Sequence, residues 1–542
     1  MKFILSLLAS VLIALAWLLP IHYRPWVTYT GELFAFFALF ALVAMYLKGK
    51  TQLPILNIPI LILAIIPLIQ WGFGQVFYFS TALMASIYLF AFGLCTIIGY
   101  NLAINEQERK RVFTWLSYVF LVSGTLTGWI AISQWLTIEQ YFPGMVNMYK
   151  AVRPFANFAQ PNNMATFLLM SLLAGLYLYE KRAIKVWIIS VCACIMVLGV
   201  ALSQSRTSWL ACACILVYGG YQYYKGLLTI KPKYALAWLS LLLIFIFTLP
   251  SITQLIASLT TAELSQTKGV VARATGDMSR LAIWQQMVHA IIDRPWFGYG
   301  WNQTSVAYTL VSEHFQGPVW IRSAHNFILD FILWNGLILG IPFLLYFSYW
   351  GFLLLKQVKS TESVIGILMV GVFLVHALLE FPQNYAYFLL PVGFILGVVQ
   401  AQQKQKSIQL SPYVMRGIFV VGLILLGLIY RDYNVLVPKL NQSMRFEKQP
   451  EKITIQDKIY ILTELDERIN WIRLDPKTQL SWVELERIHK MVLSYPTKYD
   501  VLKYARALAY NGYEKEARHQ LWLLKQLKHV DVSYESLLEP TQ

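Results

Sequence analysis

Thirteen apolar runs dominate the sequence, and each is about as long as a helix that crosses a lipid bilayer. Such a crossing takes about 20 apolar residues. Charged residues make up only 13% of the 542 residues, about half of what a soluble domain carries. We therefore expect an all-α polytopic membrane protein with about 13 transmembrane helices (12–14) and exclude a purely soluble enzyme. The runs lie near 3–20, 31–47, 53–71, 78–100, 112–135, 163–179, 184–202, 208–224, 233–250, 325–348, 362–379, 384–400 and 413–430.

Lys and Arg between the runs predict the orientation, because short cytoplasmic loops are enriched in both. With the N-terminus inside, the inner segments hold seventeen basic residues and the short outer loops hold four: Arg24, Lys150, Arg153 and Arg206. An odd number of spans then places the C-terminal tail outside the cytoplasm. The first run could also be a cleaved signal peptide, but it lacks a clear small-residue cleavage site. We expect it to remain as a span.

The same runs divide the chain into four predicted parts. Residues 1–250 form an N-terminal transmembrane bundle, and 251–324 form a large outer loop with an amphipathic helix. Residues 325–430 supply the C-terminal transmembrane helices, and 431–542 form a small soluble helical tail. Within the tail, residues 495–528 fit two helices joined at Asn511-Gly512, which would be one tetratricopeptide-like hairpin or simply a small helical cap.

Several functional classes find no support in the sequence. All five cysteines lie in apolar runs, which argues against a disulfide framework. Clustered Cys and His, an HExxH motif and paired carboxylates in the outer loops are all missing, so we expect no metal and no other cofactor. The phosphate-binding loop of nucleotide hydrolases is also missing, and we expect no nucleic-acid partner.

Polar residues gather at the predicted outer ends of the helices, where a buried charge costs about 3 kcal/mol or more and needs a partner or a function. One group lies in residues 153–163, which read RPFANFAQPNN. The amides could cap a helix that Pro161 opens. Capping needs one amide and the segment supplies four, so we predict a binding region here. Its candidate residues are Arg153, Asn157, Gln160 and Asn162, beside Asn163.

Two arginines are candidates for binding an anion. Arg206 lies in a short turn, residues 203–209, and could equally be an interfacial arginine that reaches toward the headgroups. Arg280 is expected in the first turn of a helix capped by Asp277 or Ser279, where a cation opposes the helix dipole unless an anion binds. A plain surface arginine is the alternative. The apolar residues at helical spacing in this helix are Leu281, Trp284, Val288 and Ile291.

His325 is the candidate general base. It stands at the outer end of the tenth run, after Arg322 and before Asp330. A histidine can take a proton from a hydroxyl near neutral pH, although a lone interfacial histidine is more often structural. Further along, His376 and Glu380 stand four residues apart and could pair on one helical face. Tyr385 and Tyr387 follow them, and interfacial tyrosines also occur in any membrane protein.

These segments together resemble the bacterial O-antigen ligase and polymerase superfamily, and within it the PglL-type protein O-oligosaccharyltransferases. Their order and the long outer loop before His325 match as well. The resemblance covers residues 1–430, and the tail is much less diagnostic. The matching pieces are RPFANFAQPNN (153–163), SQSRTSW (203–209), RPWFGYGWNQ (294–303), HNFILDFILWNG (325–336) and HALLEFPQNYAYFLLPVG (376–393).

The resemblance implies a GT-C-like helical bundle in the bacterial inner membrane with its active site on the periplasmic face. Such enzymes take a glycan from an undecaprenyl-diphosphate carrier, and PglL-type members place it on a serine or threonine of a protein, often a type IV pilin. By motif, His325 would be the base, and Arg206 and Arg280 would hold the diphosphate. The site region would include Gln160 and Tyr385, with Tyr387, Arg153, Asn157, Asn162, Arg322 and Glu380 around them.

One position departs from the family pattern. The histidine motif often has a small or aromatic residue three positions after its glycine, whereas Leu339 stands there in this chain and Gly340 follows. The helix packing below the site is therefore open to question. Two other functions also stay open: the same transfer to a sugar acceptor, as in an O-antigen ligase or glycan polymerase, and transport of lipid-linked sugars. Transporters tend to show internal repeats and broken helices at mid-membrane depth, whereas the polar groups here cluster near one face.

Overall fold

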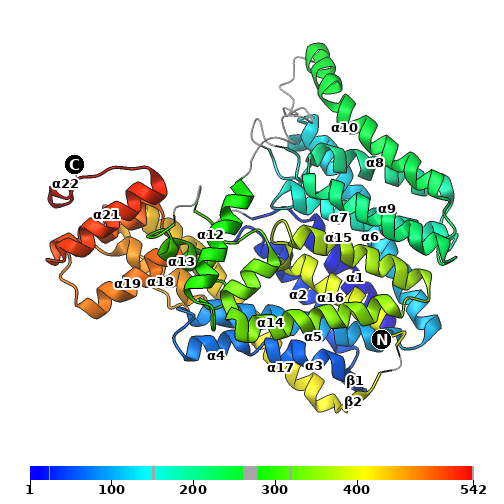
Figure 1. The fold of residues 1–542 in the computed structure, drawn as a ribbon, viewed down its shortest axis with the longest axis horizontal. Coiled ribbons are helices and arrows are strands. Elements are labelled where there is room, and N and C mark those ends of the chain that lie inside the picture. Colours follow the sequence, from blue (N-terminus) through cyan, green and yellow to red (C-terminus); the bar gives the residue numbers. More distant parts are fainter. Residues whose placement is uncertain (23–24, 149–152, 261–278, 316–319, 404, 540–542) are drawn as a thin grey trace. The chain divides into compact units, whose positions relative to one another are not determined.

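The computed structural model describes residues 1–22, 25–148, 153–260, 279–315, 320–403 and 405–539. The described chain is almost entirely helical, with one short pair of antiparallel strands, β1 (Thr51–Pro54) and β2 (Ser407–Leu410) (Figure 1). Two compact units are present. The first comprises 1–61, 88–277 and 347–419, and the second comprises 62–87, 278–346 and 420–542.

Helices occupy all thirteen predicted runs. The first nine runs form α1 (Lys2–Leu18), α2 (Tyr29–Ala44), the series η1 (Ile55–Asn57), α3 (Ile58–Leu63) and α4 (Ile66–Gly72), α5 (Phe79–Ala103), α6 (Glu106–Trp135), α7 (Pro161–Glu180), α8 (Val186–Ser203), α9 (Arg206–Tyr224) and α10 (Pro232–Thr260). The last four form α14 (Phe327–Lys356), α15 (Thr361–Ala377), α16 (Ala386–Gln400) and α17 (Pro412–Arg445).

Seven of the described helical segments are long and apolar enough to cross a membrane, and four apolar helices are shorter. The seven are 55–72, α5, α6, α8, α10, α14 and α17, and the shorter four are α1, α2, α15 and α16. The protein is therefore an all-α polytopic membrane protein. The third run is broken rather than continuous, because a turn at 64–65 precedes Pro67 at the start of α4. Helix α17 also continues past the predicted boundary at residue 430.

Small residues let the helices of the first unit pack closely. Gly124 on α6 lies against Ser171 of α7 and Met196 of α8, and a Cβ at this position would collide with the serine side chain. Gly397 on α16 lies against the backbone of Thr96 on α5, which leaves equally little room. Because lipid tails are as apolar as the helices, such close packing, rather than burial from water, holds transmembrane helices together.

In the second unit, α14 is interrupted at Gly336, and the loop of residues 295–300 fills the interruption. Gly336 has φ +63° and ψ −173°, a conformation that essentially only glycine adopts. The amide nitrogens of Tyr299 and Gly300 donate to the carbonyls of Leu333 (2.8 Å) and Trp334 (3.0 Å). The amide of Leu337 donates back to the carbonyl of Pro295 (2.7 Å). These three hydrogen bonds bridge the break and satisfy backbone groups that an interrupted helix would otherwise leave without a partner.

We expect Gly336→Ala to destabilise the protein by about 3 kcal/mol or more. The added Cβ would require a strained backbone and would collide with the carbonyl of Trp296. Gly351→Ala is the matched control on the same helix, since a Cβ there meets nothing within 4 Å. Thermal unfolding in detergent measures both. Equal midpoints for the two variants would show that the bonded break is not needed for stability.

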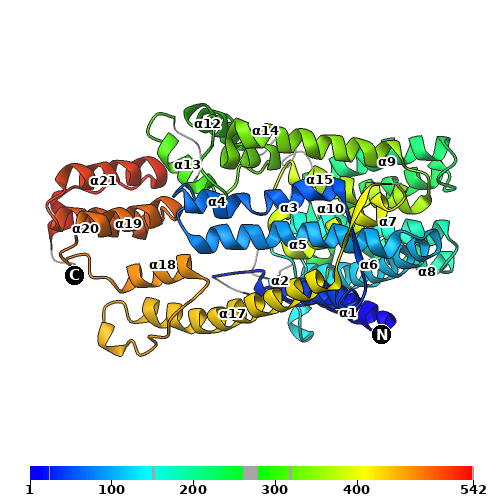
Figure 2. The ribbon, with the colours of Figure 1, turned by 90° about the horizontal axis from the view of Figure 1, so that it is seen from below.

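The tail adopts the predicted hairpin. Helices α20 (Lys498–Tyr510) and α21 (Glu514–Lys528) meet at Gly512, which has φ +82°, and they lie side by side (Figure 2). Ala505, Leu508, Ala517 and Leu524 are buried in one hydrophobic cluster. The remaining tail helices are α18 (Thr463–Arg473), α19 (Trp482–Ser494) and α22 (Glu535–Leu538), with a short turn η4 (Pro450–Lys452).

Candidate functional site

His325 sits in a loop of the second unit directly before α14, in an unusual backbone conformation. Its φ is +51°, in the left-handed region that few residues other than glycine enter. Its amide nitrogen donates to Oγ of Ser323 (3.1 Å), and the side chain is half-buried. Asn326 follows, and its Oδ1 accepts from the amides of Ile328 (3.0 Å) and Leu329 (3.2 Å), which caps α14. Residues in such conformations concentrate at active sites, where the surroundings hold them in place.

The buried carboxylate of Asp330 holds the His325 loop. It accepts from Oγ of Ser323 (2.6 Å), from the amide of Ala324 (2.9 Å) and from Oγ1 of Thr304 (2.7 Å). Thr304 opens α13 (Thr304–Val311) and accepts in turn from the indole of Trp334 (2.8 Å). Asp330 was not among the predicted site residues. An acidic residue inside an apolar run was the signal that could have identified it.

The tail also contacts this loop within the second unit. The guanidinium of Arg322 lies over the ring of Tyr495, 4.2 Å from its centroid, and over that of Trp320 at 5.6 Å. Burial raises the pKa of the Tyr495 hydroxyl, so the ring stays neutral beneath the cation. Ser305 Oγ donates to the carbonyls of Leu493 (3.1 Å) and Ser494 (3.0 Å). Arg322 therefore lies between the tail and the residues that lead to His325.

Arg280 lies in the first turn of α12 (Ser279–Asp293), as predicted, and this helix is bonded to the histidine loop. The indole of Trp284, one turn further along, donates to the carbonyl of Ala324 (3.0 Å), the residue before His325. The candidate cap Asp277 lies outside the described residues, as does the side chain of Ser279.

The predicted apolar stripe of α12 is not the buried face of this helix. Leu281 and Val288 are exposed, whereas Ile283, Met287 and Ala290 are buried. The helix is thus apolar on two sides, and periodicity alone could not say which side packs inward.

In the first unit, Arg153 and Arg206 both lie at the turn between α8 and α9. Nη1 of Arg153 donates to the carbonyls of Ser203 (3.1 Å) and Gln204 (3.4 Å). Arg206 is the first residue of α9, after Ser205 at the N-cap. The turn thus combines two cations with the positive end of a helix, which favours an anion.

The side-chain amide of Asn157 forms hydrogen bonds within the protein. Its Nδ2 donates to the carbonyls of Leu18 (2.6 Å) and Gly144 (2.7 Å), and its Oδ1 accepts from the amide of Val146 (3.0 Å). Gln134, a buried amide on α6, binds the same segment, with its Oε1 accepting from the amide of Ala156 (2.7 Å). Sequence reasoning missed Gln134, although an amide near the end of an apolar helix was a usable signal.

The amides that follow reach the segment before α16 instead of capping their own helix. Pro161 opens α7 as predicted, and Gln160 is the N-cap residue but makes no side-chain cap. Nδ2 of Asn162 donates to Oε1 of Glu380 (3.1 Å), and Nδ2 of Asn163 lies 3.4 Å from the hydroxyl of Tyr387. The rings of Tyr385 and Tyr387 stack with centroids 5.3 Å apart. The structure thus brings Asn162, Glu380, Tyr385 and Tyr387 together.

His376 lies in the last turn of α15, which ends at Ala377, and the amide of Glu380 still donates to the carbonyl of His376 (2.8 Å). Nδ1 of His376 lies 2.9 Å from Oγ1 of Thr166 on α7. Sequence reasoning also missed Glu32, a buried carboxylate in the first turn of α2 that accepts from the amide of Ala386 (2.5 Å) and so orders the start of α16.

No group of three or more His, Cys, Asp and Glu that could hold a metal ion occurs in the described part of the chain. The described residues therefore offer guanidinium and imidazole groups, amides and hydroxyls to a ligand. Such groups can bind a phosphate and move a proton.

Three family models match consecutive parts of this chain. The O-antigen ligase model matches residues 191–344, which include Arg206, Arg280 and His325. The model for the C-terminal part of a virulence-factor membrane-bound polymerase matches 364–525 and so reaches into the tail. A protein glycosylation ligase model matches 154–179.

Two relatives in Acinetobacter baylyi extend these matches to almost the whole chain. One is named a general O-oligosaccharyltransferase and is 42% identical over 540 residues, 99% of this chain and 94% of the relative. The other is named a ComP-specific O-oligosaccharyltransferase and is 26% identical over 462 residues, 84% of this chain and 82% of the relative. The chain therefore belongs to the PglL-type protein O-oligosaccharyltransferases of the O-antigen ligase superfamily, and it is a membrane-bound glycosyltransferase that acts in protein O-glycosylation.

Proposed function

We propose that this enzyme transfers a glycan en bloc from an undecaprenyl-diphosphate carrier to serine or threonine hydroxyls of periplasmic proteins. It would act in the bacterial inner membrane with its active site on the periplasmic face, in keeping with the Lys/Arg bias. The more similar relative is the one named as general. We therefore propose several acceptor proteins, a type IV pilin among them, rather than one dedicated acceptor.

His325 would be the general base. The acceptor oxygen attacks the anomeric carbon, and the proton of the hydroxyl passes to the imidazole as the new carbon–oxygen bond forms. The bond from the anomeric carbon to the diphosphate breaks, and undecaprenyl diphosphate leaves with the electron pair. The single observation that carries this role is the loop geometry: His325 is held at φ +51° by a loop that Asp330 bonds at Ser323 and Ala324 and ties to Thr304 of α13.

Arg206 and Arg280 would bind the diphosphate. Each lies in the first turn of a helix, α9 or α12, where the backbone amides and the dipole add to the guanidinium charge. Such preorganised cations stabilise the charge that develops on a leaving diphosphate. We propose that no metal is needed, since the arginines can neutralise the leaving group and the carrier already activates the glycan.

The direct test is a transfer reaction with purified components. Purified enzyme in detergent is incubated with lipid-linked oligosaccharide and a candidate pilin, and the intact pilin is weighed by mass spectrometry. A gain of one glycan mass on a serine or threonine is expected, and EDTA should leave the yield unchanged. If no pilin or other periplasmic protein gains mass while a lipopolysaccharide core does, the acceptor is a sugar and the protein-acceptor proposal fails.

Arg206→Ala is expected to slow transfer about 10- to 100-fold. This is the rate loss expected when one or two charge-assisted hydrogen bonds to the diphosphate are removed. Arg206→Lys should restore part of the rate, because lysine keeps the charge but loses the bidentate fork. The measurement is the initial rate as a function of carrier concentration. Arg182→Ala, which removes an exposed arginine at the α7–α8 turn, is the matched control and should transfer normally. A normal rate for Arg206→Ala would remove this residue from the diphosphate site.

A further inference from the structure

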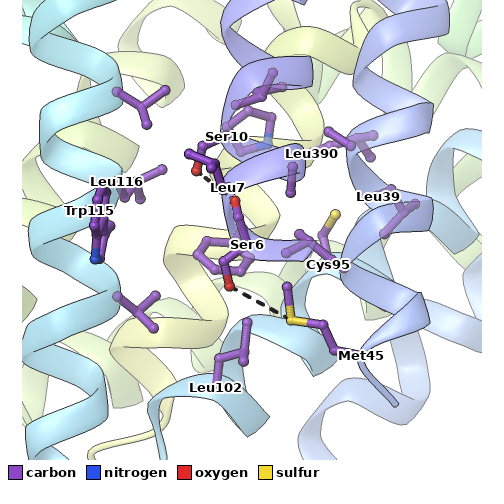
Figure 3. A pocket seen from close by; sticks show the side chains of 18 of the residues that line it. Ser6, Leu7, Ser10, Leu39, Met45, Cys95, Leu102, Trp115, Leu116 and Leu390 are labelled. Atoms are coloured by element: carbon purple, nitrogen blue, oxygen red, sulfur yellow. Dashed lines mark hydrogen bonds between the residues drawn. The ribbon is translucent and has the colours of Figure 1, made fainter. Parts of the chain in front are cut away.

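The first unit contains a cavity of about 280 Å³ that the transfer reaction does not use. Its walls come from the first half of α1, the second half of α2, the end of α5, the start of α6 and the middle of α16 (Figure 3). The opposite end of α1 carries Leu18, whose carbonyl binds Asn157. The cavity therefore lies toward the end of this bundle away from the polar groups of residues 153–163.

Small side chains create the cavity. Ser6, Ala9 and Ser10 line it from α1, and Ala35 and Ala38 line it from α2. Larger apolar groups complete the wall, among them Leu39, Leu102, Leu116 and Leu390 (Figure 3).

The hydroxyls of Ser6 and Ser10 on the wall both have partners within the protein. Ser10 Oγ donates to the carbonyl of Ser6 (2.8 Å), and Ser6 Oγ lies 4.0 Å from the sulfur of Met45 (Figure 3). A wall of this kind suits a hydrocarbon chain better than water, since water in a cavity needs two or more polar partners. Phe3 and Leu7 on the wall are also exposed, so this wall of the cavity reaches the surface of the first unit.

The charged residues on the cavity lining carry a net positive charge. They are Lys2, Arg111 and Glu108. Arg111 Nη1 lies 4.0 Å from Glu108 Oε1, and both side chains are exposed, so this pair is weak. The ammonium of Lys2 lies 5.6 Å from the ring centroid of Tyr46. Both cations line the cavity, and basic pockets between transmembrane helices on the cytoplasmic side are typical sites for anionic lipid headgroups.

We propose that this cavity binds one acyl chain of an anionic phospholipid, with the lipid phosphate between Lys2 and Arg111. By the Lys/Arg bias, the lipid comes from the inner leaflet, the side opposite to the proposed transfer reaction. The charge at the cavity favours a phospholipid headgroup over a neutral lipid, and the apolar wall accepts its chain. The proposal does not depend on the identity of the glycan donor or acceptor.

Native mass spectrometry of the full-length protein in detergent tests the proposal. The protein is mixed with equal amounts of phosphatidylglycerol and phosphatidylcholine that carry identical acyl chains, and the retained lipids are counted. We expect phosphatidylglycerol to be retained about tenfold better, in line with the attraction of two basic side chains. The double variant Lys2→Gln/Arg111→Gln should lose this preference, whereas Lys231→Gln/Lys233→Gln, which removes two exposed lysines outside the cavity, should keep it.

A second variant tests the cavity itself. Ser10→Phe places a ring in the space for the chain and should reduce retention of both lipids, with thermal unfolding as the check that the protein is folded. Equal retention of the two lipids by the wild type, or unchanged retention by folded Ser10→Phe, would overturn the proposal. Displacement of phosphatidylglycerol by an equal amount of undecaprenyl phosphate would also overturn it, because the cavity would then hold a prenyl chain.

Discussion

Replacing His325 with alanine is expected to lower glycan transfer by about 10²- to 10⁴-fold, the usual contribution of a general base. The substitution removes the group that would take the proton of the acceptor hydroxyl. It should leave the loop in place, because the bonds of Asp330 to the neighbouring residues Ser323 and Ala324 do not involve the imidazole and are kept. The measurement is the initial rate of transfer to an acceptor protein, normalised to the amount of folded enzyme.

His314→Ala is the matched control for this experiment. His314 lies in the same outer segment of the second unit and is exposed, and its loss should not change the rate. A His325→Ala enzyme that transfers glycan at the wild-type rate would show that another group takes the proton. A variant that accumulates poorly would instead assign His325 a structural role.

Replacing Asp330 with alanine is expected to be equally damaging for activity and also to lower stability. The change leaves the hydroxyls of Ser323 and Thr304 and the amide of Ala324 without their acceptor. Each buried donor left without a partner costs about 1–3 kcal/mol, so the loop would no longer hold His325. The midpoint temperature of thermal unfolding and the rate of glycan transfer should both fall. Asp330→Asn should be intermediate, since it keeps one acceptor oxygen.

A double variant separates positioning from chemistry. If Asp330 acts through His325, His325→Ala/Asp330→Ala should transfer no more slowly than His325→Ala alone, because residues that act as a unit are not additive. If the rate losses of the two single variants multiply in the double variant, Asp330 has a role separate from that of His325. Asp531→Ala, at an exposed carboxylate paired with Lys525 in the tail, is the control for loss of an acidic residue and should behave as wild type.

The sequence alone predicted the positions of some candidate residues better than it predicted the contacts of others. Arg280 was predicted in the first turn of a helix and Arg206 in a short turn, and the structure places both in the first turn of a helix. The amides of residues 157–163 were predicted as one group. The structure divides them: Asn157 orders its own loop, whereas Asn162 reaches Glu380. Nothing in a local pattern distinguishes these two roles, since both residues are asparagines in the same short segment.

For Glu32 and Asp330, the sequence predicts that the residue is unusual but does not predict which groups it binds. Each is an acidic residue inside an apolar run, so the sequence marks it as unusual. The groups they bind are either 354 positions away, as for Ala386, or folded back from the preceding loop, as for Ser323. The local composition can predict that a carboxylate is buried, but it cannot predict which hydrogen-bond donors surround it.

The sequence by itself determined the helices, their apolar character and the tail hairpin. The reason is physical: a chain in lipid must satisfy its backbone within each segment, so a run of apolar residues has little alternative to a helix. Only the tertiary structure decided which face of α12 is buried, how the segment 294–303 bonds the break at Gly336, and which carboxylate holds His325. Those outcomes depend on contacts between distant segments, where the shape and hydrogen bonds of the partner, not the local pattern, set the lowest free energy.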